Sequence, residues 1–249
     1  MMRISLKDKT KIIILINIII IILGISLIIY GNSDNNNIFI NIGSGLLASG
    51  IVAIFYLIYP HLNIEEDYLR FRRMGLINVY QRRDLNQEYS ELLEKAEKNI
   101  DVLGLGLNQF REENGEILKL KAIEGIKIRL LVVKPKSKIV SIRSYQENDL
   151  SDETIEIPLK KMLEYVKEVN EAISESKKGK KIEIKYYKAI PSTMIFRIDD
   201  IMFIGPYLHK VMSRNTITFK AENNTKIFNQ YIEHFNNLWD DEKCTFDFQ

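Results

Sequence analysis

The sequence predicts a mixed α/β protein with two parts, an apolar helical hairpin at the N-terminus and one globular domain after it. Between residues 12 and 59 the only charged residue is Asp34, so nearly all of the charge lies elsewhere. After residue 75, strand-like and helix-like segments alternate, which is typical of a sheet covered by helices. The single cysteine, Cys244, excludes a disulfide scaffold. Two long apolar runs are too few for a multi-span transporter.

Residues 12–30 and 38–59 are the two apolar runs, and we expect each to form a transmembrane helix. The first spans roughly 28 Å at 1.5 Å per residue, close to the hydrocarbon thickness of a bilayer. The polar segment GNSDNNN between them has no Lys or Arg. A signal peptide is the alternative interpretation of the first run. We disfavour it because the run is longer than a usual signal core and no small-residue cleavage site follows.

The charges that flank these runs predict their orientation. Basic residues precede the first run and follow the second: Arg3, Lys7, Lys9, Lys11, Arg70, Arg72 and Arg73. We therefore expect both termini in the cytoplasm and the protein in the inner (cytoplasmic) membrane, with the lipid bilayer as a partner.

The second run contains small residues at spacings that let helices approach closely. The pairs are Ser44/Ala48, Gly45/Ser49 and Ser49/Ala53. They predict either packing against the first run of the same chain or a homo-oligomer formed through this helix. Asn17 and Asn41 lie at different depths and cannot pair within one hairpin. Each is expected to bond either the backbone or a second copy.

The remaining domain boundaries follow from composition. Residues 1–59 form the hairpin, residues 60–74 a charged helical stalk, and residues 75–249 one cytoplasmic domain. That domain is long enough to bury its own core. Its first half predicts a strand or turn at 75–84, a helix at 86–98 with Asn86 as its cap, and a buried strand at 100–107. A helix capped by Asn108 then runs to Glu124 and Gly125 ends it.

The second half of the domain continues the alternation. A strand at 126–133 stops at Lys134-Pro135, and residues 138–178 are mostly helical, with a boundary near Pro158. Strands follow at 181–189, 194–198, 201–208 and 216–221, with Asp199-Asp200 as a hairpin turn between the second and third. A helix at 225–239 ends the pattern. The alternating part predicts a parallel sheet, and the late hairpin predicts a mixed edge.

Gly104 and Gly106 have the first spacing of a dinucleotide-binding motif, but Gln109 stands where the third glycine would be. We interpret both glycines as close approaches of a strand end to a neighbour. Ligands nevertheless gather where such a strand end leads into a helix. Asn108 is therefore a candidate ligand contact.

Residues 191–214, PSTMIFRIDDIMFIGPYLHKVMSR, are the richest in candidate chemistry. They resemble one half of the phospholipase D-like fold, whose His-x-Lys-x4-Asp motif runs down a strand into a hairpin. In this chain the three positions fall on Ser192, Met194 and Asp199, and Gly205-Pro206 follows where the family has a small pair. The resemblance extends in pattern over about residues 75–240.

The departures from the motif predict the chemistry. The family's histidine forms a phospho-enzyme intermediate, and its lysine binds the phosphate. A serine without an adjacent base is a poor nucleophile, and a methionine cannot hold an anion. The resemblance therefore implies a catalytically degenerate domain, and we expect neither cofactor nor metal.

Cationic residues near this motif are expected to rebuild an anion site. Arg197, His209, Lys210 and Arg214 would hold phosphate through charge-assisted hydrogen bonds, and Tyr207 would stack on a base. In the alternative interpretation, Arg197 pairs with Asp199 or Asp200 at the surface and His209 is merely exposed. The candidate ligand-binding set is Asn108, Ser192, Arg197, Asp199, Tyr207, His209, Lys210 and Arg214.

These features predict a membrane-anchored sensor or effector. Its domain would bind a nucleotide, another anionic ligand or a protein partner, and would signal to the hairpin. Similarity to membrane-anchored proteins of bacterial defence loci implies a role in antiviral defence. The alternative is a membrane-bound phosphodiesterase or phospholipase-type hydrolase with His209 as nucleophile or base. A scaffold that docks another protein is the third possibility.

The charge distribution of the domain gives little support for nucleic-acid binding. The net charge of +2 is small. One basic run contains Lys177, Lys178, Lys180, Lys181, Lys185 and Lys188. We interpret it as a solvated helix end and loop, with contact to anionic lipid headgroups or nucleic acid as the alternative. We expect no nucleic-acid partner.

Overall fold

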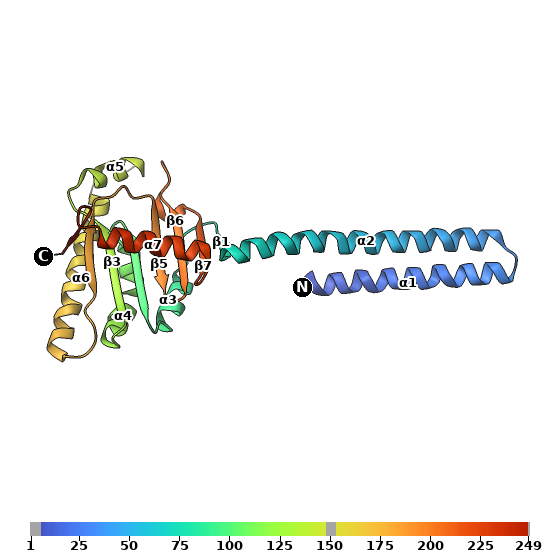
Figure 1. Ribbon diagram of the computed structural model, residues 1–249, viewed down its shortest axis with the longest axis horizontal. Coiled ribbons are helices and arrows are strands. Elements are labelled where there is room, and N and C mark those ends of the chain that lie inside the picture. The colour runs from blue at the N-terminus through green and yellow to red at the C-terminus, as the bar shows by residue number, and fades with distance from the viewer. Residues whose placement is uncertain (1–5, 148–152, 249) are drawn as a thin grey trace. The chain divides into compact units, whose positions relative to one another are not determined.

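The computed structural model describes residues 6–147 and 153–248. The chain divides into two compact units, Met1–Arg70 and Phe71–Gln249. Helices α1 (Leu6–Ser33) and α2 (Asn37–Met74), the last turn of which belongs to the second unit, run antiparallel as a hairpin (Figure 1). Each contains a stretch long and apolar enough to cross a membrane, Ile12–Ser33 in α1 and Asn37–Tyr56 in α2. The expected hairpin of two apolar helices is confirmed, and the stalk predicted at residues 60–74 is a continuation of α2.

Glycines set the contact between the two helices of the hairpin. A Cβ on Gly43 would lie 2.6 Å from the Gly24 carbonyl oxygen, and one on Gly50 would lie 2.5 Å from Ile21 Cγ1. A Cβ at Gly43 would thus collide with the backbone of α1, whereas one at Gly50 would displace the Ile21 side chain. The small residues predicted to pack there instead lie mostly on the exposed side of α2, namely Ser44, Gly45, Ala48 and Ser49. The interpretation that these pairs pack against the first helix was therefore wrong, and the alternative, a homo-oligomer formed through them, stays a prediction.

The polar side chain of Asn17 bonds within its own helix. Its Nδ2 donates to the Ile13 carbonyl oxygen at 2.9 Å, and the residue is only 8% exposed. For Asn17 the expected backbone bond is thus confirmed.

The second unit contains one eight-stranded sheet within the described residues, in the order β1-β7-β6-β5-β2-β3-β4-β8. The strands are β1 (Leu76–Tyr80), β2 (Asn99–Gly104), β3 (Lys127–Val133), β4 (Glu183–Tyr187), β5 (Thr193–Ile198), β6 (Ile201–Pro206), β7 (Thr218–Glu222) and β8 (Thr245–Asp247). The helices are α3 (Asn86–Glu94), α4 (Asn108–Ile123), α5 (Lys138–Gln146), α6 (Glu153–Ser176), α7 (Lys226–Asp240) and the short 3₁₀ helix η1 (Ser213–Asn215).

The sheet is mixed, but the late hairpin does not lie at its edge as predicted. Strands β2, β3 and β4 are parallel, whereas β5 pairs antiparallel with β2 and carries β6, β7 and β1 beyond it. Parallel pairing needs a crossover, and helices supply one only between β2, β3 and β4. The hairpin therefore occupies the middle of the sheet, where Ile100 pairs with Ile198.

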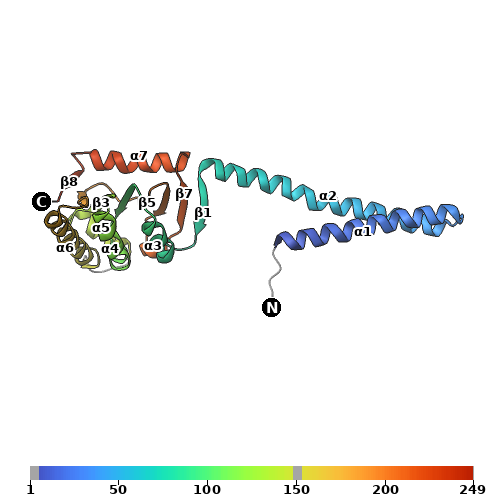
Figure 2. The ribbon, with the colours of Figure 1, turned by 90° about the horizontal axis from the view of Figure 1, so that it is seen from below.

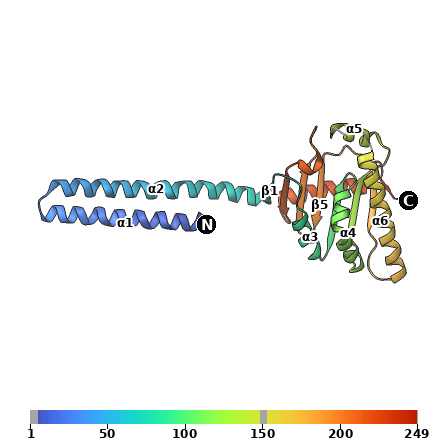
Figure 3. The same ribbon diagram turned by 180° about the vertical axis from the view of Figure 1, so that it is seen from behind.

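Helices cover both faces of the sheet. Helices α3, α4 and α6 pack on one face and α7 on the other, as the two opposite views show (Figures 1 and 3). The view from below separates the two layers (Figure 2). Alternation along β5 sends Met194 and Phe196 to the core under α3, α4 and α6, and Ile195 to the core under α7.

Local signals at several element ends were misread. Asn86 and Asn108 are the first residues of α3 and α4, and the cap positions are Leu85 and Leu107, neither with a side-chain cap bond. Pro158 lies inside α6 instead of at its boundary, and β8 and η1 were not predicted. Gly125 does end α4, with a φ of +89° that favours glycine.

Candidate functional site

A cavity of about 260 Å³ opens at the carboxyl end of β2, between the sheet and helices α3, α4 and α6. We call it the β2-end pocket. Its apolar wall includes Val102, Leu105, Leu107, Phe110, Ile155, Pro158, Met194, Phe196 and Met212. Its polar lining consists of Arg83, Asn86, Tyr89, Asn108, Gln109, Glu113, Asn114, Glu147, Tyr207, Ser213 and Arg214. Of the residues predicted from sequence, Asn108, Tyr207 and Arg214 meet here.

The turn from β2 into α4 shapes one side of the pocket. A Cβ on Gly106 would lie 3.0 Å from the Ile155 carbonyl oxygen and 3.1 Å from Pro158 Cβ. The close-approach interpretation of this glycine is confirmed. Leu107 follows with a φ of +53°, which a branched side chain rarely adopts. This backbone brings the start of α4 to the pocket wall.

Arg83, from the segment between β1 and α3, lies on the pocket floor. Its Nη2 donates to the Pro206 carbonyl oxygen at 3.3 Å and to Thr216 Oγ1 at 2.9 Å. The guanidinium covers Gly205, where a Cβ would lie 2.7 Å from Nη2. Gly205 is the cross-strand partner of Met194. Arg83 thus places a positive charge against the strand pair formed by Met194 and Gly205.

Tyr89 of α3 contributes a second polar group to the pocket. Its ring packs edge-on against Phe196 and Phe203, with centroids 4.9 and 4.8 Å away. The residue is only 6% exposed. Burial raises the pKa of Tyr89 strongly, and the nearby charge of Arg83 opposes this in part. The hydroxyl is therefore protonated at neutral pH and can donate a hydrogen bond.

Tyr207 lies between cations of the protein itself. The guanidinium carbons of Arg83 and Arg143 are 5.2 and 4.9 Å from its ring centroid. Burial raises the pKa of Tyr207, so the phenol stays neutral. These contacts favour a role for Tyr207 in holding the arginines, and its predicted stacking on a base stays a prediction.

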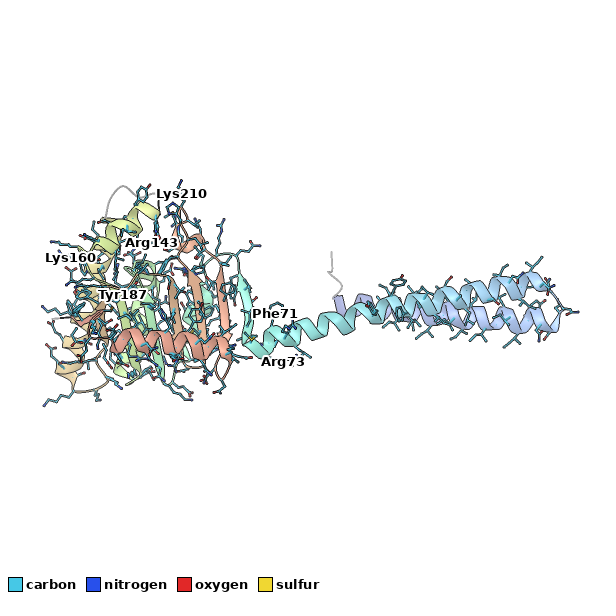
Figure 4. All side chains as sticks on the ribbon, turned by 45° about the horizontal axis from the view of Figure 1, so that its top comes forward. Phe71, Arg73, Arg143, Lys160, Tyr187 and Lys210 are labelled. Carbon is cyan, nitrogen blue, oxygen red and sulfur yellow. The ribbon has the colours of Figure 1, made fainter. Side chains whose placement is uncertain are left out.

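Arg143 of α5 fastens the segment after β6 to this end of the domain. It donates to the carbonyl oxygens of Leu208 and Val211 at 3.1 and 3.4 Å and pairs with Glu147 at 2.6 Å. Figure 4 shows Arg143 near Lys210 at this end. The segment that carries Arg214 is thereby held at the pocket.

Arg197 lies on the opposite face of the sheet, under α7. Its Nη1 pairs with Asp101 Oδ2 at 3.0 Å, and its guanidinium carbon is 5.6 Å from the Phe228 ring centroid. We expected, as the alternative, that Arg197 pairs with the carboxylate of Asp199 or Asp200, and this was wrong. Arg197 Nε instead donates to the Asp199 backbone oxygen at 2.9 Å.

The Asp199 carboxylate is occupied by the backbone. It accepts the N–H groups of Glu97, Lys98 and Asn99 at 2.7, 2.8 and 2.8 Å. The motif aspartate therefore fixes the entry to β2 and does not line the pocket.

Ser192, His209 and Lys210 also lie outside the pocket lining. The Ser192 carbonyl accepts the Tyr207 N–H at 3.1 Å, and the Lys210 N–H donates to the Gln146 carbonyl at 2.6 Å. His209 and Lys210 are exposed. Only Arg214 of the four predicted cations reaches the pocket, and the expected alternative for His209, an exposed loop position, is confirmed. Across residues 6–147 and 153–248, no three His, Cys, Asp or Glu side chains converge as metal ligands.

Comparison with known proteins gives no family model and no curated protein that matches the chain. Structural neighbours include phosphatidylserine synthase from Haemophilus influenzae Rd KW20, with 11% identity over 68% of this chain and 39% of that one and a TM-score of 0.45. NucT from Helicobacter pylori matches with 12% identity over 69% and 98% of the two chains, at 0.42.

A further neighbour is TrmBL2, an archaeal chromatin protein whose structure is described as showing a novel mode of DNA binding. It matches with 16% identity over 81% of this chain and 69% of that one, with a TM-score of 0.41. Because all three TM-scores lie below 0.5, function has to be inferred from this chain's own residues.

Proposed function

We propose that this protein is a membrane-anchored sensor whose α/β domain binds a small anionic ligand in the β2-end pocket. The observation that carries the proposal is Arg83, which sets a guanidinium beside Met194 on the pocket floor. The domain thereby keeps a cation for an anion after the motif lysine has been lost.

Arg83 and Arg214 supply the positive charge of the site, whose lining also contains two carboxylates with partners of their own, Glu113 bonded by Asn86 and Gln109, and Glu147 paired with Arg143. Arg83 is fixed by Pro206 and Thr216, whereas the exposed side chain of Arg214 has no hydrogen bond or ion pair with any residue the structure describes. Guanidinium groups bind phosphate and carboxylate through paired N–H donors, and the interaction is strongest away from bulk water. One fixed and one free arginine suit a site that closes around an anion.

The signal would pass through α2. This helix extends from the second apolar stretch to Met74, and its end is tied to the domain by an Arg72–Glu222 ion pair at 3.7 Å. The Glu222 N–H also donates to the Gly75 carbonyl at 3.1 Å. A ligand that favours one of two domain states would shift the hairpin with it. Membrane insertion, cytoplasmic termini, hairpin association and a role in antiviral defence belong to this proposal.

Hydrolysis is the weaker candidate. A hydrolase needs a nucleophile beside a base. The described residues that line the pocket include neither histidine nor cysteine, and His209 is exposed outside it. The pocket's chemistry therefore favours binding.

Thermal unfolding of the full chain in detergent micelles tests the proposal. A panel of nucleotides, polyphosphates and anionic metabolites should contain a ligand that raises the Tm. At 100 times Kd the stabilisation is about 2.7 kcal/mol. Arg214→Gln and Arg83→Lys should weaken that shift, whereas Arg82→Gln, an exposed neighbour outside the pocket, should not. The proposal fails if no anion stabilises the protein, or if all three variants respond like the parent chain.

A further inference from the structure

We infer that the β2-end pocket is built for a nucleoside monophosphate, with one phosphate oxygen accepting hydrogen bonds from Arg83 Nε and the Tyr89 hydroxyl. This inference rests on the proposed function and names the ligand class of the same site. The nucleoside would lie along the apolar wall formed by Phe110, Met194 and Phe196.

Two residues that line the pocket each carry an unsatisfied hydrogen-bond donor. Among the described residues, seven buried side-chain polar atoms have no hydrogen-bond partner. Only two of them, Arg83 Nε and Tyr89 Oη, belong to residues that line this pocket. Unpaired buried donors are rare and costly in folded proteins, so each calls for an acceptor.

Arg83 Nε and the Tyr89 hydroxyl share the ability to donate a hydrogen bond. Arginine has no acceptor atom and stays protonated, and the neutral phenol of Tyr89 can donate its proton. Both residues line the same cavity, and the two donor atoms themselves are buried. Two unpaired donors on residues of one cavity favour an acceptor-only group such as a phosphate oxygen.

The size and lining of the rest of the cavity suit a nucleoside. Its volume of about 260 Å³ is slightly below the ~300–1,000 Å³ of pockets for drug-sized ligands. A single compact body fits such a space better than two acyl chains. Three side-chain amides at the wall can bond the polar edge of a nucleobase through the amide atom that their protein hydrogen bonds leave over, namely Asn86 Oδ1, Asn108 Nδ2 and Gln109 Oε1. Asn114 already bonds Ser90 and Phe110.

The apolar wall of the pocket distinguishes a nucleotide from inorganic phosphate. A free phosphate would leave the apolar wall in contact with water, whereas an attached nucleoside would cover it. The ester should therefore bind more tightly than the bare anion, and the nucleoside without phosphate should lose the contacts with Arg83 and Tyr89.

Calorimetric titration of the full chain in detergent micelles tests the inference. The probes are the four common ribonucleoside monophosphates, adenosine, inorganic phosphate and dihexanoyl phosphatidic acid. At least one nucleoside monophosphate should bind ten or more times more tightly than inorganic phosphate, adenosine or the lipid phosphate. Tyr89→Phe should weaken that binding by about 10- to 100-fold, the value of a hydrogen bond to a charged group.

Tyr80→Phe is the matched control, because the Tyr80 hydroxyl bonds to Glu88 and the residue does not line the pocket. It should leave the affinity unchanged. The Tm of unliganded Tyr89→Phe should not fall, because the substitution removes a hydroxyl without a partner. If this variant misfolds, Arg83→Lys, which keeps the charge but not the Nε donor geometry, takes its place and should weaken binding similarly.

Equal affinity for inorganic phosphate and every nucleoside monophosphate overturns the inference, as does preferred binding of the lipid phosphate. Unchanged affinity in Tyr89→Phe also overturns it. All three results leave the proposed anion sensor intact. Absence of binding by every anion overturns the sensor as well.

Discussion

Half-buried arginines lie on both faces of the central sheet, but they differ in their hydrogen-bond partners. Under α7, Asp101 is fully buried and accepts from Arg129 Nε at 2.7 Å and from Arg197 Nη1 at 3.0 Å. Arg129 also donates to Asn236 Oδ1 at 3.0 Å and lies over the Phe235 ring. On the pocket face, Arg83 Nε and the Tyr89 hydroxyl have no partner among the described residues.

This difference separates a structural charge cluster from a candidate binding site. The cluster under α7 has matched carboxylate, guanidinium and amide groups, so it has little left to offer a ligand. The pocket face retains two donors without a partner among the described residues. Charge and burial alone would not have distinguished the two, because both faces contain half-buried arginine.

Removal of the charge of Asp101 should have the largest effect. Asp101→Asn leaves Arg129 and Arg197 without their shared carboxylate, and breaking a buried pair costs about 3–5 kcal/mol. Chemical denaturation of the full chain in micelles measures the loss. An unfolding midpoint equal to that of the parent chain would show that the cluster does not stabilise the fold.

Arg197→Gln should have a smaller effect on stability and none on ligand affinity. It removes one of the two partners of Asp101, at a cost of about 1.5–3 kcal/mol for a charged hydrogen bond. Because Arg197 faces α7, binding in the pocket should not change. A loss of affinity as large as that of Arg83→Lys would contradict a purely structural role for Arg197 and support the ligand-binding role predicted from the sequence.

Two buried tyrosines, one on each face of the sheet, also differ in the partners of their hydroxyl groups. The Tyr187 hydroxyl donates to the Gly104 carbonyl at 3.2 Å, whereas the Tyr89 hydroxyl has no partner in the part of the chain described. Tyr187→Phe should therefore destabilise the unliganded protein by about 1 kcal/mol, and Tyr89→Phe should not. Equal losses in the two variants, measured by denaturation, would show that the Tyr89 hydroxyl already has a partner.

Alkaline pH should lower the contribution of both tyrosines to the free energy of unfolding by the same amount. This is the smallest of the expected effects. Burial raises the pKa of each above that of the unfolded chain. Their contribution is complete below about pH 10 and is lost as pH rises, because the unfolded state ionises first. Each tyrosine should contribute roughly 0.7 kcal/mol to the fall between pH 9.5 and 10.5. Either Phe variant should flatten the stability curve by that amount, and an unchanged slope would contradict the assignment.

Much of the element order was predictable because its signals are local. The β5–β6 hairpin follows from Asp199-Asp200, and the structure confirms it with a φ of +48° at Asp199. The caps were not predictable in the same way. Asn86 instead donates to Glu113 of α4 at 2.7 Å, a contact between helices that no local pattern specifies.

The candidate site was predictable only in part. Asn108, Tyr207 and Arg214 lie near recognisable features of the sequence and do line the pocket. Arg83 was missed because it is one of two arginines in an ordinary loop. Its bond to Pro206 joins residues 123 positions apart, so nothing near Arg83 in the sequence marks it.

The amino-acid sequence alone was enough to predict the apolar hairpin and most of the succession of strands and helices. These depend on hydropathy, periodicity and residue identity, which act over a few positions. The face that each arginine occupies and the donors that stay unpaired could be seen only in the folded domain. Those outcomes depend on the order of strands in the sheet, and that order is set by packing between segments far apart in the chain.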